Sequence, residues 1–353
     1  MGKVMDIKCP SCSATLHFNS KIGKMKCEYC GSEFTAEDLE KPKEENFDKK
    51  DEYKENTNIN FVSYNCPDCG AEIVADEATS ATFCLYCGST AILKDKLSGK
   101  FKPDLIIPFK TEKQQAIDEF IKLRKGRPLM PKSFNDSKNI EKIRGLYVPF
   151  WLYNTTVEGG IKAKGTKVQT WTIGDTHYTK TDYYNLVREG SSSYTRIPTD
   201  GSTRFDNNIM NTIEPFDYKE LVKFNPAYLS GFLAEKYDVD SEEAFKEAGS
   251  RAINSAKEIM LNDMIGYGSK SVIENTLAAK MDSYEYALLP VWMVNVKYND
   301  NFYLFAMNGQ TGEFIGNIPL DKKKVVIYFV CAFVIAFLIF LLISYFLFLG
   351  GVH

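Results

Sequence analysis

The sequence predicts two small cysteine-rich β modules, then an α+β domain, and one transmembrane helix at the carboxyl end. Eight of the nine cysteines form two identically spaced tetrads in the first quarter of the chain. The middle of the chain alternates short apolar runs, typical of strands, with amphipathic helical stretches. An uncharged run of 25 residues near the carboxyl end is long enough to cross a membrane as a helix.

Each tetrad has the spacing C-x2-C, fourteen residues, C-x2-C, and the first recurs 57 residues later. Two thiolates from one tight turn and two from another complete a tetrahedral all-sulfur shell, which suits structural Zn²⁺. Disulfides are the alternative in an oxidising compartment. We therefore expect two structural zinc ions, bound by Cys9, Cys12, Cys27, Cys30, Cys66, Cys69, Cys84 and Cys87.

The turn at each C-x2-C pair, here called a knuckle, favours glycine because its backbone tends to adopt a positive φ. Ser13 stands at one knuckle, and glycines stand at the others, namely Gly31, Gly70 and Gly88. The fourteen residues between knuckles predict a short hairpin in each module, with turns at 19–23 and 76–80.

Both copies contain C-P-x-C and C-x-Y-C-G, and over about residues 7–93 they resemble the transcription-factor-IIB-type zinc ribbon. We expect ribbon 1 at 1–35 and ribbon 2 at 61–96, as semi-independent units. The segment 36–60 between them is rich in charge and poor in apolar residues, which favours a flexible linker over an interaction tail.

Residues 101–320 have the pattern of an α+β cytoplasmic domain. A buried strand at 105–109 opens it. An amphipathic helix follows, with Thr111 and Gln114 as its capping box. A strand at 143–153 contains P-F-W and closes this first unit.

A second strand–helix–strand pattern follows, with an apolar run at 221–224, a helix over 241–262 and a strand at 286–298. Its L-P-V-W-M-V-N matches V-P-F-W-L-Y-N of the first unit. We therefore predict an internal duplication, with units of about 101–160 and 215–318.

The remaining segments of the domain are predicted to be β structure. A meander is expected over 171–204 and a hairpin over 302–315. The glycines before the meander are expected to close a further hairpin; they are Gly159, Gly160 and Gly165.

The uncharged run at 325–349 would span about 37 Å as a helix, more than the roughly 30 Å hydrocarbon core. Lys322, Lys323 and Lys324 precede it directly, which predicts a single-pass protein whose amino-terminal bulk lies in the cytoplasm. Cytosolic thiols stay reduced, so this topology favours zinc over disulfides.

Catalytic patterns are weak. The chain has three histidines, and His177 beside Asp175 and Asp182 is interpreted as a turn or core residue because no G-x-S-x-G elbow exists. Neither a phosphate loop nor a dinucleotide fingerprint is present. We expect no enzyme activity, no catalytic residues and no small-molecule substrate.

The charge balance disfavours nucleic-acid binding. The formal net charge is -3, ribbon 1 carries five lysines against three acids over 1–34, and ribbon 2 carries two lysines against five acids over 61–96. Phosphate-backbone binders need a basic excess.

The chain as a whole is similar to a family of bacterial membrane-anchored proteins with transcription-factor-IIB-type zinc ribbons. The similarity rests on both C-P-x-C knuckles, V-P-F-W, N-P-A-Y-L-S-G-F, L-P-V-W, A-M-N-G-Q-T-G and the terminal helix. The family implies no established catalysis, and its members resemble components of membrane-stress assemblies that recruit phage-shock-type scaffold proteins. We thus expect a protein adaptor in the bacterial cell membrane. A membrane-tethered nucleic-acid binder is the alternative.

Overall fold

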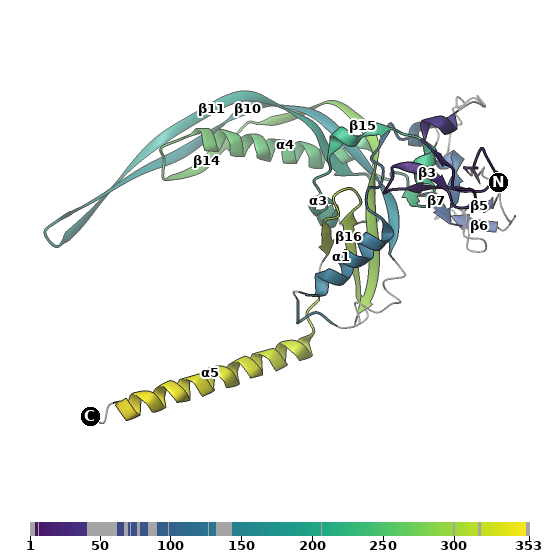
Figure 1. Cartoon of the computed structure of the whole chain (residues 1–353). Helices are drawn as coiled ribbons and strands as arrows, with labels where there is room; N and C mark the ends of the chain where they lie inside the picture. Colours follow the sequence, from purple (N-terminus) through teal and green to yellow (C-terminus); the bar gives the residue numbers. More distant parts are fainter. Residues whose placement is uncertain are drawn as a thin grey trace.

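The computed structural model describes residues 4–5, 7–40, 62–66, 70, 72–75, 78–83, 90–97, 99–125, 127–131, 143–205, 207–298, 301–316 and 319–350 (Figure 1). A curved body of sheet and helices lies beside the amino-terminal modules, and a long β arm and the carboxyl-terminal helix extend from it. The architecture is mixed α and β, as predicted.

The first module is a three-stranded antiparallel sheet of β2 (Leu16–Asn19), β3 (Lys24–Cys27) and β4 (Glu33–Phe34), followed by a 3₁₀ turn at Glu37–Glu40. The predicted turn at 19–23 is confirmed. The Asn19 side-chain oxygen accepts hydrogen bonds from the backbone N–H groups of Lys21 and Ile22, and Gly23 has φ 66°.

The second module divides between two sheets. β5 (Val62–Asn65) and β6 (Glu72–Ala75) pair with each other, while β7 (Thr79–Phe83) and β8 (Thr90–Leu93) belong to the large sheet of the body. There β8 pairs with β1 (Val4–Met5), and β7 pairs with β13 (Leu233–Glu235). Further 3₁₀ turns follow at Lys94–Leu97 and Gly99–Phe101.

The expectation of semi-independent modules is therefore wrong. The first module is also joined to the body, because the backbone N–H of Phe18 donates to the Ser230 carbonyl and the Asn225 amide donates to the Ala36 carbonyl. The Phe18 ring lies edge-on to Tyr228 with centroids 5.3 Å apart. Burying these apolar groups favours docking over free motion. Residues 41–60 of the expected linker lie outside the described residues.

The body is built on one twelve-stranded sheet. Its centre is the antiparallel pair β10 (Arg144–Ile173) and β15 (Ala278–Tyr298), and β15 continues to β16 (Asn301–Asn308) and β17 (Phe314–Gly316). β10 also pairs with β11 (Thr176–Asp200), β13 and β14 (Ser269–Asn275). The short strand β9 (Leu105–Ile106) pairs with β12 (Val222–Lys223) and runs parallel to β15. The predicted hairpin at 302–315 is confirmed.

Both predicted helices of the body form, as α1 (Lys113–Lys125) and α4 (Ser241–Asp263). The capping of α1 is displaced by one residue, since the Gln115 side chain accepts a hydrogen bond from the backbone N–H of Glu112 at 2.8 Å. α4 packs on the sheet through alanines at every fourth position, which allow a close approach; they are Ala244, Ala248, Ala252 and Ala256. Ile259 near the end of the same helix is exposed.

A short helix, α3 (Asn207–Thr212), and 3₁₀ turns at Tyr218–Glu220 and Pro226–Leu229 complete the body.

The region 155–200 differs most from the prediction. β10 and β11 form one continuous hairpin that reverses between Ile173 and Thr176, so neither the meander nor the hairpin closed by glycines exists. The glycines lie inside β10. Gly159 has φ 125°, and a Cβ there would lie 2.4 Å from the Thr276 carbonyl oxygen, so this glycine permits a close backbone approach.

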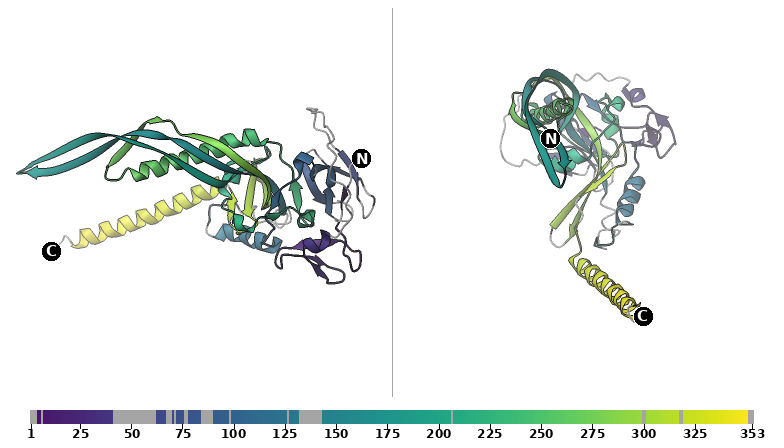
Figure 2. Two further views of the ribbon diagram at one scale, coloured as in Figure 1. Left: turned by 90° about the horizontal axis from the view of Figure 1, so that it is seen from above. Right: turned by 90° about the vertical axis from the view of Figure 1, so that its left-hand side faces the viewer.

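We call the β10–β11 hairpin beyond Thr155, together with β14 and α4, the arm. It is an elongated, curved layer of strands with α4 along one face (Figures 1 and 2). Its apolar core lies between strands and helix and includes Val157, Ile161, Ala163, Leu186, Ala252, Ala256 and Met260.

The carboxyl-terminal helix α5 (Lys322–Gly350) contains the predicted span. Residues Lys322–Tyr345 are long and apolar enough to cross a membrane, and none of that window is buried by the rest of the chain. The backbone N–H of Asp321 donates to the Leu129 carbonyl, which joins the start of α5 to the body.

Candidate metal centre

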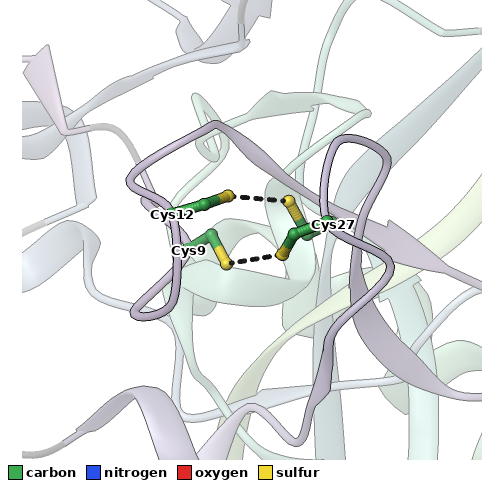
Figure 3. A group of neighbouring side chains, drawn as sticks. Cys9, Cys12 and Cys27 are labelled. Atoms are coloured by element: carbon green, nitrogen blue, oxygen red, sulfur yellow. Dashed lines mark hydrogen bonds between the residues drawn. The ribbon is translucent and has the colours of Figure 1, made fainter.

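Four cysteine sulfurs of the first module lie close together and form one cluster. The Sγ atoms of Cys9, Cys12, Cys27 and Cys30 all lie within 4.8 Å of one another. Cys9 and Cys30 are 3.6 Å apart, and Cys12 and Cys27 are 3.5 Å apart. Figure 3 shows Cys9 and Cys12 on one loop facing Cys27 on the other.

Two backbone turns position these sulfurs. The N–H of Ser13 donates to the Cys9 carbonyl at 2.8 Å, and the N–H of Gly31 donates to the Cys27 carbonyl at 2.9 Å. Both turns need a positive φ, 62° at Ser13 and 76° at Gly31. The serine knuckle thus has the glycine-like conformation that the sequence predicted, at a steric cost that glycine avoids.

The cluster fits a tetrahedral metal ion. With Zn–S bonds of about 2.3 Å, a regular tetrahedron has sulfur–sulfur edges of about 3.8 Å. The observed 3.5 and 3.6 Å separations are close to that value. Four sulfurs leave no coordination position for water, so this donor set suits a structural ion.

The pKa values of two thiols of the cluster are shifted in opposite directions. Hydrogen bonds from the side chain and backbone of Ser32 lower the pKa of Cys30 to about 6, while the pKa of Cys12 is raised to about 12. For Cys12 the backbone hydrogen bond from Ala14 favours the thiolate, but burial and the neighbouring thiols outweigh it. Four adjacent thiolates repel one another, so a cation is needed for all four to ionise together.

The second tetrad is described in part. Cys66 is buried, and the N–H of Gly70 donates to its carbonyl at 2.9 Å with φ 73° at Gly70. This knuckle therefore has the same backbone geometry as the two knuckles of the first module. Cys69, Cys84, Cys87 and Gly88 lie outside the described residues, as do residues 76–77 of the turn expected at 76–80, and β7 begins at Thr79.

The chain is similar to the uncharacterized protein YdjG of Bacillus subtilis (strain 168). The two are 35% identical over 326 residues, which cover 92% of this chain and 93% of YdjG. The chain belongs to the YdjG family. No protein-family model matches it, and no solved structure does. Because YdjG is itself described as uncharacterized, the YdjG family brings no activity to this chain.

The two described histidines of this YdjG-family chain, His17 and His177, contribute no atom to the cysteine cluster. His17 is half-buried on β2 opposite Lys26, and the clustered ligand atoms are all sulfurs. His177 is exposed beside the turn of the arm, where its Nδ1 lies 2.8 Å from the Thr172 hydroxyl. It flanks a turn, one of the two environments predicted for it. Ser191 is a serine of the same strand, but it lies fourteen residues further along the strand from His177.

Sequence reasoning missed the role of Ser32. The cysteine spacing assigns it no role, yet its hydroxyl lies 3.2 Å from the Cys30 sulfur. The signal was present, because a serine follows the fourth cysteine by two residues in both copies, as Ser32 and Ser89.

Proposed function

We propose that this chain is a membrane-anchored cytoplasmic adaptor that binds a protein partner at the bacterial cell membrane. The observation that carries the proposal is α5, an apolar helix that the rest of the chain leaves unburied. Such a surface is stable in lipid and unfavourable in water. Lys322, Lys323 and Lys324 at its start favour a cytoplasmic location for the body.

We propose two structural zinc ions, one in each transcription-factor-IIB-type ribbon. The four sulfurs of the first module support one site. The shared knuckle geometry of Cys66 and Gly70 supports the second, with Cys69, Cys84 and Cys87 as its other ligands. Zinc would hold each pair of knuckles together and add to the stability of strands that are too short to fold alone.

We also infer that the α+β domain arose by internal duplication. In the β10–β15 ladder, Pro149 lies opposite Leu288, and Tyr147 lies opposite Pro290. The motif alignment places Tyr147 at position 288 and Pro149 at Pro290, a shift of 141 residues. A two-fold axis between the two strands therefore exchanges these two pairs. Likewise, β9 runs parallel to β15 as β13 runs parallel to β10. The counterpart of β9 is then β13, not the run at 221–224.

The two tryptophans of the matching motifs support the same inference. The Trp151 indole donates to the Val239 carbonyl at 2.9 Å, and the Trp292 indole donates to the Thr111 hydroxyl at 2.8 Å. Each acceptor residue lies two positions before the first residue of a helix, α4 or α1. The backbone hydrogen bonds of the two prolines also correspond. The N–H of Gly201 donates to the Pro149 carbonyl, and the N–H of Gly309 donates to the Pro290 carbonyl.

We propose that the chain acts by binding and not by catalysis, in an envelope-stress assembly. A phage-shock-type scaffold protein is the first partner to test, because the full-length resemblance points to such assemblies. The exposed face of the first ribbon offers a contact, since Tyr29 between two ligand cysteines is 85% exposed. A large aromatic ring on a rigid metal-bound loop is a common anchor of protein interfaces.

The test is affinity purification of the full chain from detergent-solubilised membranes, followed by mass spectrometry. Tyr29→Ala removes the exposed ring without touching a ligand, and Lys21→Ala on the same module is a matched control. We expect Tyr29→Ala to lose the partner, with zinc content unchanged. If Tyr29→Ala and Cys27→Ser both retain every partner, the first ribbon is not the recognition element.

The alternative, a membrane-tethered nucleic-acid binder, is favoured only by the ribbon resemblance. The acidic balance of the second ribbon opposes it. Salt-sensitive binding of single- or double-stranded nucleic acid by the full chain in detergent would favour this alternative.

A further inference from the structure

The outer end of the arm is a two-stranded ribbon without a supporting layer among the described residues. β14 accompanies β10 as far as the Thr166–Ser269 pair, and α4 ends at Asp263. Seven further pairs, from Lys167–Asp182 to Ile173–Thr176, extend the hairpin by about 23 Å at 3.3 Å per residue. Isolated two-stranded ribbons are only marginally stable in water, so this segment gains from contact with another phase or partner.

Large apolar side chains gather at this end. Ile173 is 64% exposed, and Trp171 and Tyr178 are each 44% exposed. These residues occupy one face, since Trp171 is paired with Tyr178 and Ile173 lies two residues further along. The Trp171 and Tyr178 rings stack with centroids 5.7 Å apart and planes 10° apart. Val168 and Tyr183 are also exposed, on the opposite face of the ribbon.

The composition of this end suits the boundary between lipid and water. Trp and Tyr concentrate at membrane interfaces because their rings are apolar while the N–H and O–H groups stay hydrated. The charged side chains of the seven pairs and their turn are two lysines and two aspartates, Lys167, Lys180, Asp175 and Asp182, and Lys180 forms an ion pair with Asp182 at 3.1 Å. Lysines can extend to the headgroups while their stems stay in apolar surroundings.

The arm also points in a suitable direction. Figures 1 and 2 show that the arm and α5 extend from the body on the same side. A membrane crossed by α5 therefore lies on the side toward which the arm points. Because α5 would keep the whole chain at the surface, the hairpin end would meet lipid at a high effective concentration.

We propose that the hairpin end formed by Trp171, Ile173 and Tyr178 is a second membrane contact, which inserts into the lipid–water interface of the leaflet facing the body. With α5 it holds the body at two points and so restricts its orientation at the membrane. This role rests on the proposed anchoring by α5. The duplication favours a dedicated purpose for the arm, because β11 has 25 residues whereas β16, its counterpart in the other unit, has 8.

The protein contains its own probe. The chain has three tryptophans, of which Trp151 and Trp292 are each only 5% exposed in the body. Full-length protein in vesicles of phosphatidylcholine and phosphatidylglycerol, with bromine on the acyl chains, should show fluorescence quenching that comes from Trp171. Trp171→Phe keeps an aromatic ring and removes the probe, so the quenching should be lost in that variant.

A second carboxylate at the tip, in addition to Asp175 at the turn, tests insertion itself. Ile173→Asp should abolish quenching of Trp171 and shift its emission to longer wavelength. Val187→Asp is the matched control, because Val187 is 48% exposed on the same hairpin, eleven residues or about 36 Å along the strand from Thr176. It should leave quenching unchanged. Exposed positions of this kind tolerate substitution without unfolding.

Flotation of the same vesicles separates the two proposals. If the protein does not float with the lipid, anchoring by α5 is wrong. If it floats but wild type and Trp171→Phe are quenched equally, with Trp171 open to aqueous iodide, the hairpin end is not a membrane contact. Equal loss of quenching in Ile173→Asp and Val187→Asp would also overturn the proposal.

Discussion

Asp200 provides a sharp test of the packing in the body. It ends β11, is 5% exposed, and one carboxylate oxygen accepts a hydrogen bond from the Ser202 backbone N–H at 3.0 Å. The other oxygen has no hydrogen-bond partner among the described residues. Burial raises the pKa of Asp200 to about 8; the Ser202 hydrogen bond opposes this shift, and the negative charges of Asp238, Glu235 and Glu247 add to it.

The raised pKa makes stability depend on pH. Below the ordinary value of 3.8 the carboxyl is protonated in both states, and above it the unfolded chain ionises first. Folded stability from this group is therefore lost as pH rises from about 4 to about 8. At 1.4 kcal/mol per pH unit, the three units between pH 5 and pH 8 correspond to an upper limit of about 4 kcal/mol.

Asp200→Asn removes the ionisable group and keeps the shape. We expect the free energy of unfolding of the variant to exceed that of the wild type by about 2–4 kcal/mol more at pH 8 than at pH 5. Urea unfolding of the full chain in detergent, followed by tryptophan fluorescence, measures this difference.

The matched control is Asn308→Asp at the corresponding end of β16. The Asn308 amide donates to the Ile213 carbonyl at 3.0 Å and the Pro215 carbonyl at 3.1 Å, and Asp would lose both donors. This variant should be destabilised more at pH 8 than at pH 5. An Asp200→Asn effect that is equal at the two pH values would refute the assignment of Asp200 as a buried, neutral acid.

Three further predictions concern the metal sites and the anchor. Ser13→Gly should stabilise the first module by about 0.5–1 kcal/mol, because glycine adopts φ 62° without strain; slower zinc loss to a chelator is the measurement, and faster loss would contradict it. Full-length protein purified under reducing conditions should contain two zinc ions per chain by elemental analysis, and Cys27→Ser should contain one; a wild-type value near zero would exclude the zinc sites. Truncation after Leu320 should release the chain from membranes, and a truncated protein that still sediments with membranes in high salt would place the anchor elsewhere.

Patterns among neighbouring residues predicted the elements that neighbouring residues determine, namely the cysteine knuckles and the helices α4 and α5. Cysteine spacing brought four sulfurs together at Cys9, Cys12, Cys27 and Cys30, because two tight turns on one short hairpin leave few other arrangements. Ser13 stands where the knuckle pattern favours glycine, and its backbone has the positive φ expected at that position. The periodicity of α4 and the apolar run of α5 predicted both helices, since each pattern repeats within a few residues.

Tertiary structure alone decided how distant segments combine. No short-range pattern distinguishes a meander from the single β10–β11 hairpin, because both alternate apolar and polar residues; pairing with β14 and β15 and packing on α4 select the long strands. The same holds for β7 and β8, which were expected in a separate ribbon and instead extend the body sheet. Asp200 is likewise unremarkable in sequence, and its pKa is raised because strands far apart in the chain exclude water around it. Local backbone conformation is determined by neighbouring residues, whereas strand pairing and burial depend on which surfaces meet when the whole chain folds.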